Sequence, residues 1–373
     1  MQASLVLRNV RLVSGLILLV FVTGHLANLA IGLHSLSAME EWRATLVGHW
    51  QSTTGRALLG GSALLHALLG LYAMAARRSL SMSKTDVVQL VLGVLTPPLL
   101  LNHVLMTAVA SEMTRDYEPS YGFLLAVYWS IAPGYAFQQL CAVVFVWVHA
   151  SLGLHSWLVL KPLWRQAGRF VLPVLFAIPI AALLGFAESG KEVVARLASD
   201  AEWRAAIEES AKAIGEVRGR LDALWSRTMA IYGVLAIAAI GAFVARILAN
   251  RMSRVSVAYD GGLAAQGRRG LSILELSRAN EVPHADVCSG RGRCGTCRVR
   301  VDAGSTSLSA RDEAEARTLA RVHAGEGERL ACQARVFGAG VAVTRLLPPF
   351  ADADAARYPQ DWDDPSRSTQ AVA

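Results

Sequence analysis

The sequence predicts an all-α bundle of six transmembrane helices over residues 1–250, followed by a small α+β domain over 251–347. Composition is the first reason: of the 373 residues, 53% are hydrophobic and only 17% are charged, whereas soluble domains carry about 25% charged residues. The second reason is distribution, because charged residues are sparse over 10–187 and frequent over 188–225 and 251–373. The third is a group of four cysteines between Cys288 and Cys332, beyond the last apolar run.

Six apolar runs are long enough to cross a bilayer, which takes about 20 helical residues. They cover 11–33, 57–76, 87–110, 134–160, 168–187 and 227–249. Pro97 and Pro98 lie inside the third run and predict a kink there, which membrane helices tolerate when neighbours satisfy the freed carbonyls. The stretch 121–133 is also apolar, but Pro133 and Gly134 interrupt its continuation into the fourth run.

The loops predict the orientation of the bundle. Alternate loops carry basic residues at Arg8, Arg11, Arg77, Arg78, Lys84, Lys161, Arg165, Arg169, Arg246, Arg251 and Arg254, whereas the opposite loops are rich in acidic residues. Because positive residues stay inside, we expect a multi-pass protein of the cell inner (cytoplasmic) membrane with both termini in the cytoplasm. The membrane-flanking arginines also account for the net charge of +7, so no nucleic-acid partner is expected.

A polar segment over 188–225 separates the fifth and sixth runs. Ile207, Ile214 and Leu221 repeat at seven residues, as do Val217 and Leu224, so the segment is predicted to be an extracytoplasmic amphipathic helix. Three roles fit the pattern: a helix folded over the outer membrane surface, a coiled coil that forms a homodimer, or a lid on a ligand site.

Short strand patterns begin at Arg254. Strands are predicted over 254–261, 297–301, 329–336 and 341–347, with helices over 271–281 and near 309–319. Strands around one main helix in so short a stretch indicate a small α+β domain. The tail over 348–373 is acidic and nearly aperiodic, and we expect it to be disordered.

The cysteines form the strongest motif of the chain. Cys288, Cys294 and Cys297 are separated by five and two residues, and Cys332 follows at a distance. Four thiolates hold the two irons of a [2Fe–2S] cluster, and the interspersed glycines let the backbone curl around the sulfides. A structural zinc site also takes four cysteines, but zinc sites favour two matched pairs, and Cys332 has no close second cysteine.

This C-terminal part resembles a known family. Residues 254–347 are similar to the β-grasp [2Fe–2S] ferredoxins, and the spacing looks more like the adrenodoxin-type branch than the plant-type branch. The resemblance implies that the cluster ligands are Cys288, Cys294, Cys297 and Cys332. The loop is crowded by Arg291, Arg293, Arg298 and Arg300. These arginines fit a solvated basic face, a docking surface for an acidic partner, or a means of tuning the cluster potential.

Histidines are concentrated in the first four apolar runs. His25, His66, His103 and His149 each lie in a different run, with His155 as an alternative to His149. At about 1.5 Å per residue from the cytoplasmic flanks, they form an outer pair, His25 with His103, and an inner pair, His66 with His149. Such pairs predict axial ligands for one or two b-type haems, because an intramembrane ionisable residue indicates function. The small residues around the histidines fit close helix packing equally well.

The membrane part also resembles known proteins. Its histidine-bearing helices look like the cytochrome b-type anchor of the succinate dehydrogenase/fumarate reductase family. The stretches GHLANLAIGLHSLSAME, ARRSLSM and WVHASLGLHSW, followed by the ferredoxin-like part, resemble the N-terminal half of bacterial class III adenylate cyclases over residues 8–347. In those enzymes a catalytic domain follows. Here about 25 residues follow Pro348, so we expect no cyclase domain and no catalytic residues in this chain.

The sequence therefore predicts a membrane-bound electron-transfer or redox-sensing protein with a cytosolic [2Fe–2S] cluster and intramembrane haem b. The alternative is the regulatory sensor half of an adenylate cyclase, and a third option is an anchor in which the cluster is only structural. No Gly-rich nucleotide fingerprint or P-loop is present. The expected partners are the bilayer, a cytosolic redox protein or a linked or separate cyclase domain, quinone, and a second copy of the chain.

Overall fold

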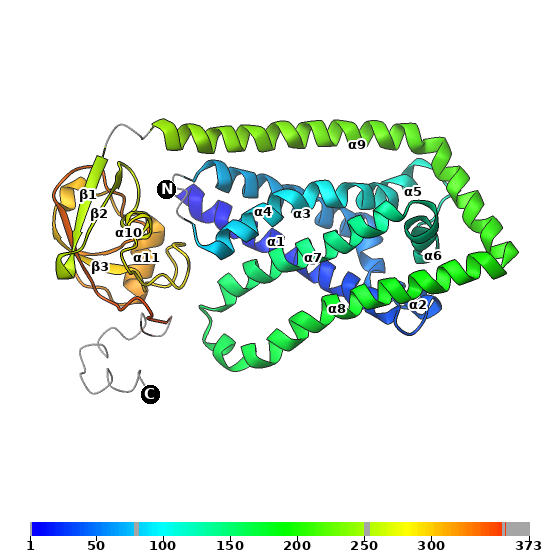
Figure 1. The fold of residues 1–373 in the computed structure, drawn as a ribbon, viewed down its shortest axis with the longest axis horizontal. Helices are drawn as coiled ribbons and strands as arrows, with labels where there is room; N and C mark the ends of the chain where they lie inside the picture. The colour runs from blue at the N-terminus through cyan, green and yellow to red at the C-terminus, as the bar shows by residue number, and fades with distance from the viewer. Residues whose placement is uncertain (1, 78–81, 250–253, 353–354, 356–373) are drawn as a thin grey trace.

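The computed structural model describes residues 2–77, 82–249, 254–352 and 355. A helical part comes first and a small mixed sheet follows (Figure 1). The long helices are α1 (Gln2–Ile31), α3 (Thr53–Ala75), α4 (Lys84–Val104), α7 (Pro133–Leu158), α8 (Pro162–Ser199) and α9 (Ala201–Ala249). They overlap the six predicted runs, and within the described residues six helices are long and apolar enough to cross a membrane. Most of the predicted tail, at 353–354 and 356–373, lies outside the described residues.

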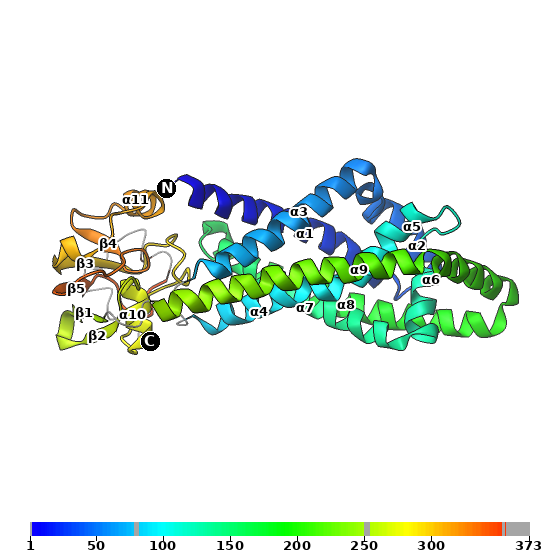
Figure 2. The same cartoon turned by 90° about the horizontal axis from the view of Figure 1, so that it is seen from above.

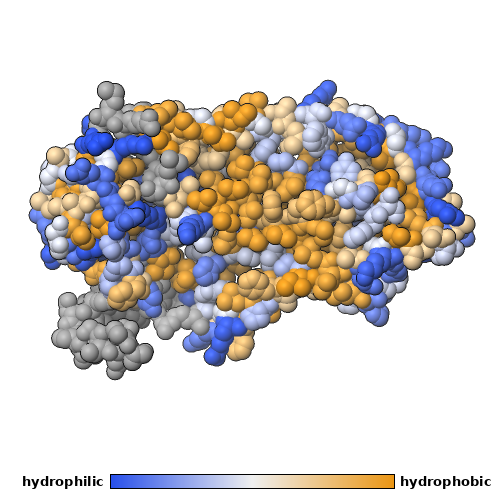
Figure 3. Space-filling model, in the orientation of Figure 1, coloured by the Kyte–Doolittle hydropathy of each residue, from blue (hydrophilic) through white to orange (hydrophobic). Residues whose placement is uncertain are grey.

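Side chains explain why these helices form a bundle with an apolar outside. Large hydrophobic residues such as Phe137, Phe176 and Ile237 are exposed, and apolar residues cover the middle of the helical part (Figure 3). Small residues bring helices together inside: Gly185 of α8 lies against the carbonyl of Leu29 in α1. An apolar exterior over a closely packed interior suits lipid rather than water.

Short helices close the end of the bundle that lies away from the sheet. They are α2 (Leu36–Leu46), α5 (Ala110–Met113) and α6 (Tyr121–Ala126), and every residue of α6 is buried. Single π-helical segments at Leu105–Val109 and Val127–Ile131 extend α4 and α6. Glu40 of α2 accepts the backbone N–H groups of Tyr121 and Gly122, which ties the first turn of α6 to α2.

The predicted single helix over 188–225 is wrong. Helix α8 continues to Ser199, Asp200 has extended backbone, and α9 begins at Ala201 and then runs on without a break into the sixth apolar run (Figure 2). The Asp200 carboxylate accepts the N–H of Trp203 and so starts the new helix. The apolar stripe that suggested a coiled coil is nevertheless real: Ile207, Ile214, Val217 and Leu221 are buried in the core of the chain itself.

The C-terminal part is a five-stranded mixed sheet in the order β2-β1-β5-β3-β4. The strands are β1 (Arg254–Tyr259), β2 (Ala264–Arg268), β3 (Arg298–Ala303), β4 (Glu328–Leu330) and β5 (Val341–Arg345). Strands β1 and β5 are parallel at the centre, and β2 lies at an edge. Helices α10 (Ile273–Ala279) and α11 (Glu313–Arg321) complete the domain. The sequence did not predict β2, because AAQGR is polar and contains glycine, which is typical of edge strands.

Candidate metal centre and histidine pairs

Three of the four cysteines lie in the loop between α10 and β3, and the fourth, Cys332, lies just after β4. All four are buried, and they meet as two pairs: the Cys294 thiol donates to Cys288 Sγ at 3.2 Å, and Cys297 is hydrogen-bonded to Cys332. Among the described residues, no three His, Cys, Asp or Glu side chains surround one metal-ion position. A single tetrahedral zinc needs four ligands around one ion. Two thiol pairs suit a centre that contains two metal ions.

The loop that carries three of these cysteines depends on glycine. Gly290, Gly292 and Gly295 have φ of 82°, 64° and 85°, in the left-handed region. A Cβ at Gly295 would lie 2.9 Å from Val322, so this turn also has no space for a side chain. The Gln333 side chain donates to the Gly290 carbonyl at 3.3 Å and closes the loop toward Cys332.

Ionisation of the thiols follows from their pairing. The hydrogen bond from Cys294 lowers the pKa of Cys288 to about 5, whereas the same bond and burial raise the pKa of Cys294. The hydrogen bond with Cys332, together with burial, raises the pKa of Cys297. Buried thiols this close cannot all ionise alone, but bound metal ions remove their protons outright. The donor set therefore fits a multiply charged metal centre.

A family-model match covers the four cysteines. Residues 260–337 match the 2Fe-2S iron-sulfur cluster binding domain. We call the part from β1 to β5 the cluster domain. A crystal structure of an ISC-like [2Fe-2S] ferredoxin from Pseudomonas putida is similar at 26% identity over 26% of this chain and 94% of that chain, with a TM-score of 0.23. All four cysteines lie within the matched residues of the cluster domain.

The four helix-borne histidines form two facing pairs. The rings of His25 in α1 and His103 in α4 have centroids 5.9 Å apart. Those of His66 in α3 and His149 in α7 are 6.1 Å apart. Each pair joins two different helices, and the partners are those that the depth estimate matched.

Hydrogen bonds orient the inner pair. The Nδ1 atom of His66 lies 3.0 Å from the Arg11 carbonyl, and that of His149 lies 2.9 Å from the Gln89 carbonyl. A carbonyl only accepts, so Nδ1 carries the proton in each ring and Nε2 keeps its lone pair. A Cβ at Gly15 or Gly93 would lie 2.8 Å from the Cε1 atom of His66 or His149, respectively, so glycine leaves space for both rings.

The outer pair and His155 have different surroundings. His103 Nδ1 lies 3.4 Å from the Tyr128 hydroxyl, and within the described chain His25 Nδ1 has no hydrogen-bond partner. His155 faces Trp164, with ring centroids 6.2 Å apart. It also lines a cavity of about 150 Å³ at the junction with the cluster domain, together with Gln89, Ser156, Val287, Ser289 and Arg291.

The cluster domain contacts the helices through the loop over residues 288–297, which we call the cysteine loop. The Arg291 guanidinium lies 2.7 Å from buried Asp86 and 3.3 Å from the Gln89 side-chain oxygen, both in α4. The Arg8 side chain of α1 donates to the Arg291 carbonyl at 3.2 Å. Gln89 thus contacts the cysteine loop with its side chain and His149 with its carbonyl. The sequence did not predict that Asp86 and Gln89 contact the cysteine loop. The one feature that could have drawn attention to this contact is an acidic residue at the start of the third apolar run.

Of the other arginines near the loop, Arg298 and Arg300 have partners within the cluster domain, and Arg293 has no ion pair with any residue that the structure describes. Arg298 pairs with Glu328 at 3.2 Å, and Arg300 pairs with Asp302 at 2.9 Å. Burial and nearby arginines lower the pKa of Arg293 to about 10. Arg291 pairs with Asp86 of the same chain, whereas a docking surface for an acidic partner protein stays a prediction.

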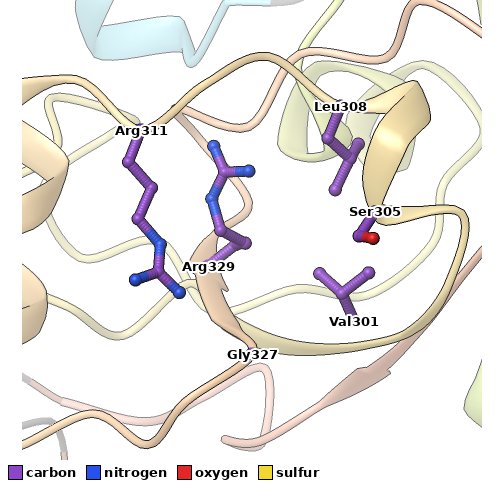
Figure 4. A pocket seen from close by; sticks show the side chains of 6 residues that line it. All are labelled: Val301, Ser305, Leu308, Arg311, Gly327 and Arg329. Carbon is purple, nitrogen blue, oxygen red and sulfur yellow. The ribbon is translucent and has the colours of Figure 1, made fainter.

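A larger cavity of about 360 Å³ lies elsewhere in the cluster domain, and Figure 4 shows Arg311 and Arg329 facing Val301 and Leu308 across it. Both arginines are already engaged: Arg329 binds buried Glu315, and Arg311 donates to the Glu328 carbonyl. The two arginines that line this cavity therefore have structural partners within the cluster domain.

Proposed function

We propose that this protein is a membrane electron-transfer protein whose cysteines hold a [2Fe–2S] cluster and whose histidine pairs hold haem b. When bound, a cluster or a haem iron takes up and releases one electron, and the protein supplies placement and tuning of the potential. The contact of the cysteine loop with Gln89, directly beside His149, carries this proposal. It joins the two candidate centres through one residue.

The cysteines would act as ligands in their two pairs. Cys288 with Cys294 would hold one iron, and Cys297 with Cys332 would hold the other. Burial of all four excludes water from the thiolates. Backbone N–H groups of Arg291, Arg293 and Cys294 are hydrogen-bonded to the Cys288 sulfur, and such groups stabilise anionic sulfur.

The ring spacing of the histidine pairs is compatible with a shared metal ion. Two imidazoles bonded to one ion at about 2.0–2.1 Å have ring centres roughly 6 Å apart, as the rings of both pairs do. The carbonyls of Arg11 and Gln89 fix the rings of the inner pair and leave Nε2 for iron. His25 and His103 would hold a second haem. His155 would hold none, because it faces Trp164 and the junction.

We further propose the cell inner membrane as the location, with the cluster domain in the cytoplasm. The start of α1 and the cluster domain lie at one end of the bundle (Figure 1). Arg8 contacts the Arg291 carbonyl there, and Arg11 and Arg77 lie within electrostatic range of Arg291. A cytosolic redox protein and quinone are the candidate electron partners.

A second candidate function is redox sensing. The ion pair between Arg291 and Asp86 would let a change in the cysteine loop bias the position of α4. A linked or separate cyclase domain, expected from the sequence resemblance, would be the reader of such a change.

A spectroscopic experiment tests the first proposal. Purified protein should show a [2Fe–2S] EPR signal and a haem Soret band after dithionite reduction. His66→Ala and His149→Ala should each lower haem content by about one per chain, whereas His155→Ala, in the same helix as His149, should leave it unchanged. Full haem content in both inner-pair variants, or zinc in place of iron at the cysteines, would refute the assignment.

A further inference from the structure

Five arginines gather where the cluster domain meets the helices. This arginine cluster consists of Arg8 and Arg11 of α1, Arg77 after α3, and Arg291 and Arg293 of the cysteine loop. All five are half-buried, and each is near enough to at least two others to repel them electrostatically. So many like charges at low exposure require a counter-charge.

The acidic side chains nearby are too few to neutralise the arginine cluster. Asp86 pairs with Arg291 at 2.7 Å. Asp86 and Glu275 act on Arg77, and Asp312 acts on Arg8, through longer range only. Within the described part of the chain, Arg8, Arg11, Arg77 and Arg293 form no ion pair, and the buried Nε of Arg8 has no hydrogen-bond partner.

Among the described residues, the cysteine site itself is a further source of negative charge. Cys288 acts electrostatically on both Arg8 and Arg293. Four thiolates and two sulfides together outweigh two ferric ions, so the loaded site is anionic. One electron added without a proton makes it more negative by one charge. The arginine cluster is therefore placed where that added charge appears.

We propose that the arginine cluster makes the junction a redox-dependent latch, in which Arg8 of the membrane part stabilises the reduced cysteine site and reduction tightens the docking of the cluster domain. The two effects are one coupling free energy and must be equal in size. This inference rests on the proposed function, since it requires a [2Fe–2S] cluster at the four cysteines.

Full-length variants with measured iron content and EPR signal test the latch by titration of the reduction potential with dithionite. Arg8→Gln should shift the ratio of oxidised to reduced protein at fixed potential by about threefold to tenfold toward the oxidised form, and tenfold equals 59 mV for one electron. Arg8→Lys keeps the charge and should keep most of the wild-type potential. Arg218→Gln removes the same charge from the exposed, distant arm of α9 and should change nothing.

Hydrogen exchange provides the second readout. Amides over 288–294 should exchange more slowly in reduced than in oxidised wild-type protein, and Arg8→Gln should remove this difference. Loss of the cluster from wild-type protein would refute the proposed function. An intact cluster with the same potential in wild type and Arg8→Gln, or equal exchange in both redox states, would refute the latch and point to another anion, such as a lipid phosphate, as the counter-charge.

Discussion

At the scale of single residues, a buried ion pair near the cysteine site holds one of the cysteines in place without contacting it. Glu315 of α11 is fully buried and accepts two hydrogen bonds from Arg329, at 2.8 and 2.9 Å, and one from the Leu330 N–H. These bonds fix β4, and Cys332 follows two residues after Leu330. A buried charge without its partner is far costlier than an exposed one.

Glu315→Gln is therefore expected to destabilise the cluster domain by about 3–5 kcal/mol, because it leaves Arg329 buried and unpaired. Urea titration of the full-length protein, followed by the visible absorption of the cluster, measures the change. Glu313→Gln is the matched control, since its partner Arg317 is 65% exposed, and it should change stability by less than about 0.5 kcal/mol. Equal losses in the two variants would contradict the argument.

The cysteine motif could be recognised from the sequence because its chemistry and spacing are local signals. The histidines could be paired by depth, and their role as haem ligands stays a prediction. Asp86 and Gln89 could not be recognised, because their role depends on Arg291, about two hundred positions further along the chain. An aspartate at the start of a helix is an ordinary N-terminal residue until its partner is known.

At the scale of secondary-structure elements, α4 shows how the membrane part tolerates irregular backbone. Pro97 and Pro98 lie inside the helix, and Pro98 leaves the Val94 carbonyl without its helical donor. The Tyr232 hydroxyl of α9 donates to that carbonyl at 2.6 Å. The expectation that neighbours satisfy freed carbonyls is thus met here, but the sequence could not identify α9 as the neighbour.

The contact between α1 and α8 depends on a missing side chain. A Cβ at Gly185 would lie 2.0 Å from the Leu29 carbonyl oxygen. Gly185→Ala should therefore force the helices apart and cost about 1–3 kcal/mol, measurable as a lower unfolding temperature in detergent. Gly233→Ala in α9, where the described structure leaves open space around the Cβ, should be neutral or mildly stabilising. Unchanged stability of Gly185→Ala would show that the two helices are not in this contact.

At the scale of the whole molecule, the arrangement predicts which parts face each side of the membrane. The junction of α8 and α9 lies at one end, and the cluster domain lies at the other (Figure 2). The order of six apolar helices could be predicted from hydropathy, whereas the break at Asp200 could not, because no glycine or proline marks it.

Cysteine labelling tests this arrangement. In intact cells a membrane-impermeant maleimide should label Lys212→Cys, on the exposed face of α9, and should leave Glu326→Cys of the cluster domain unlabelled. Permeabilisation should make Glu326→Cys reactive as well. The unsubstituted chain, whose Cys141 is half-buried within α7, serves as the background. The reverse labelling pattern would place the cluster domain outside.

The contact between Arg8 and Arg291 spans 283 positions of the chain, and this separation has a consequence for biogenesis. The first helix enters the bilayer long before the cysteine loop has been translated. Closing so long a loop must follow the formation of local structure. Docking of the cluster domain on α1 therefore has to follow synthesis of the cysteine loop, long after α1 itself has been made.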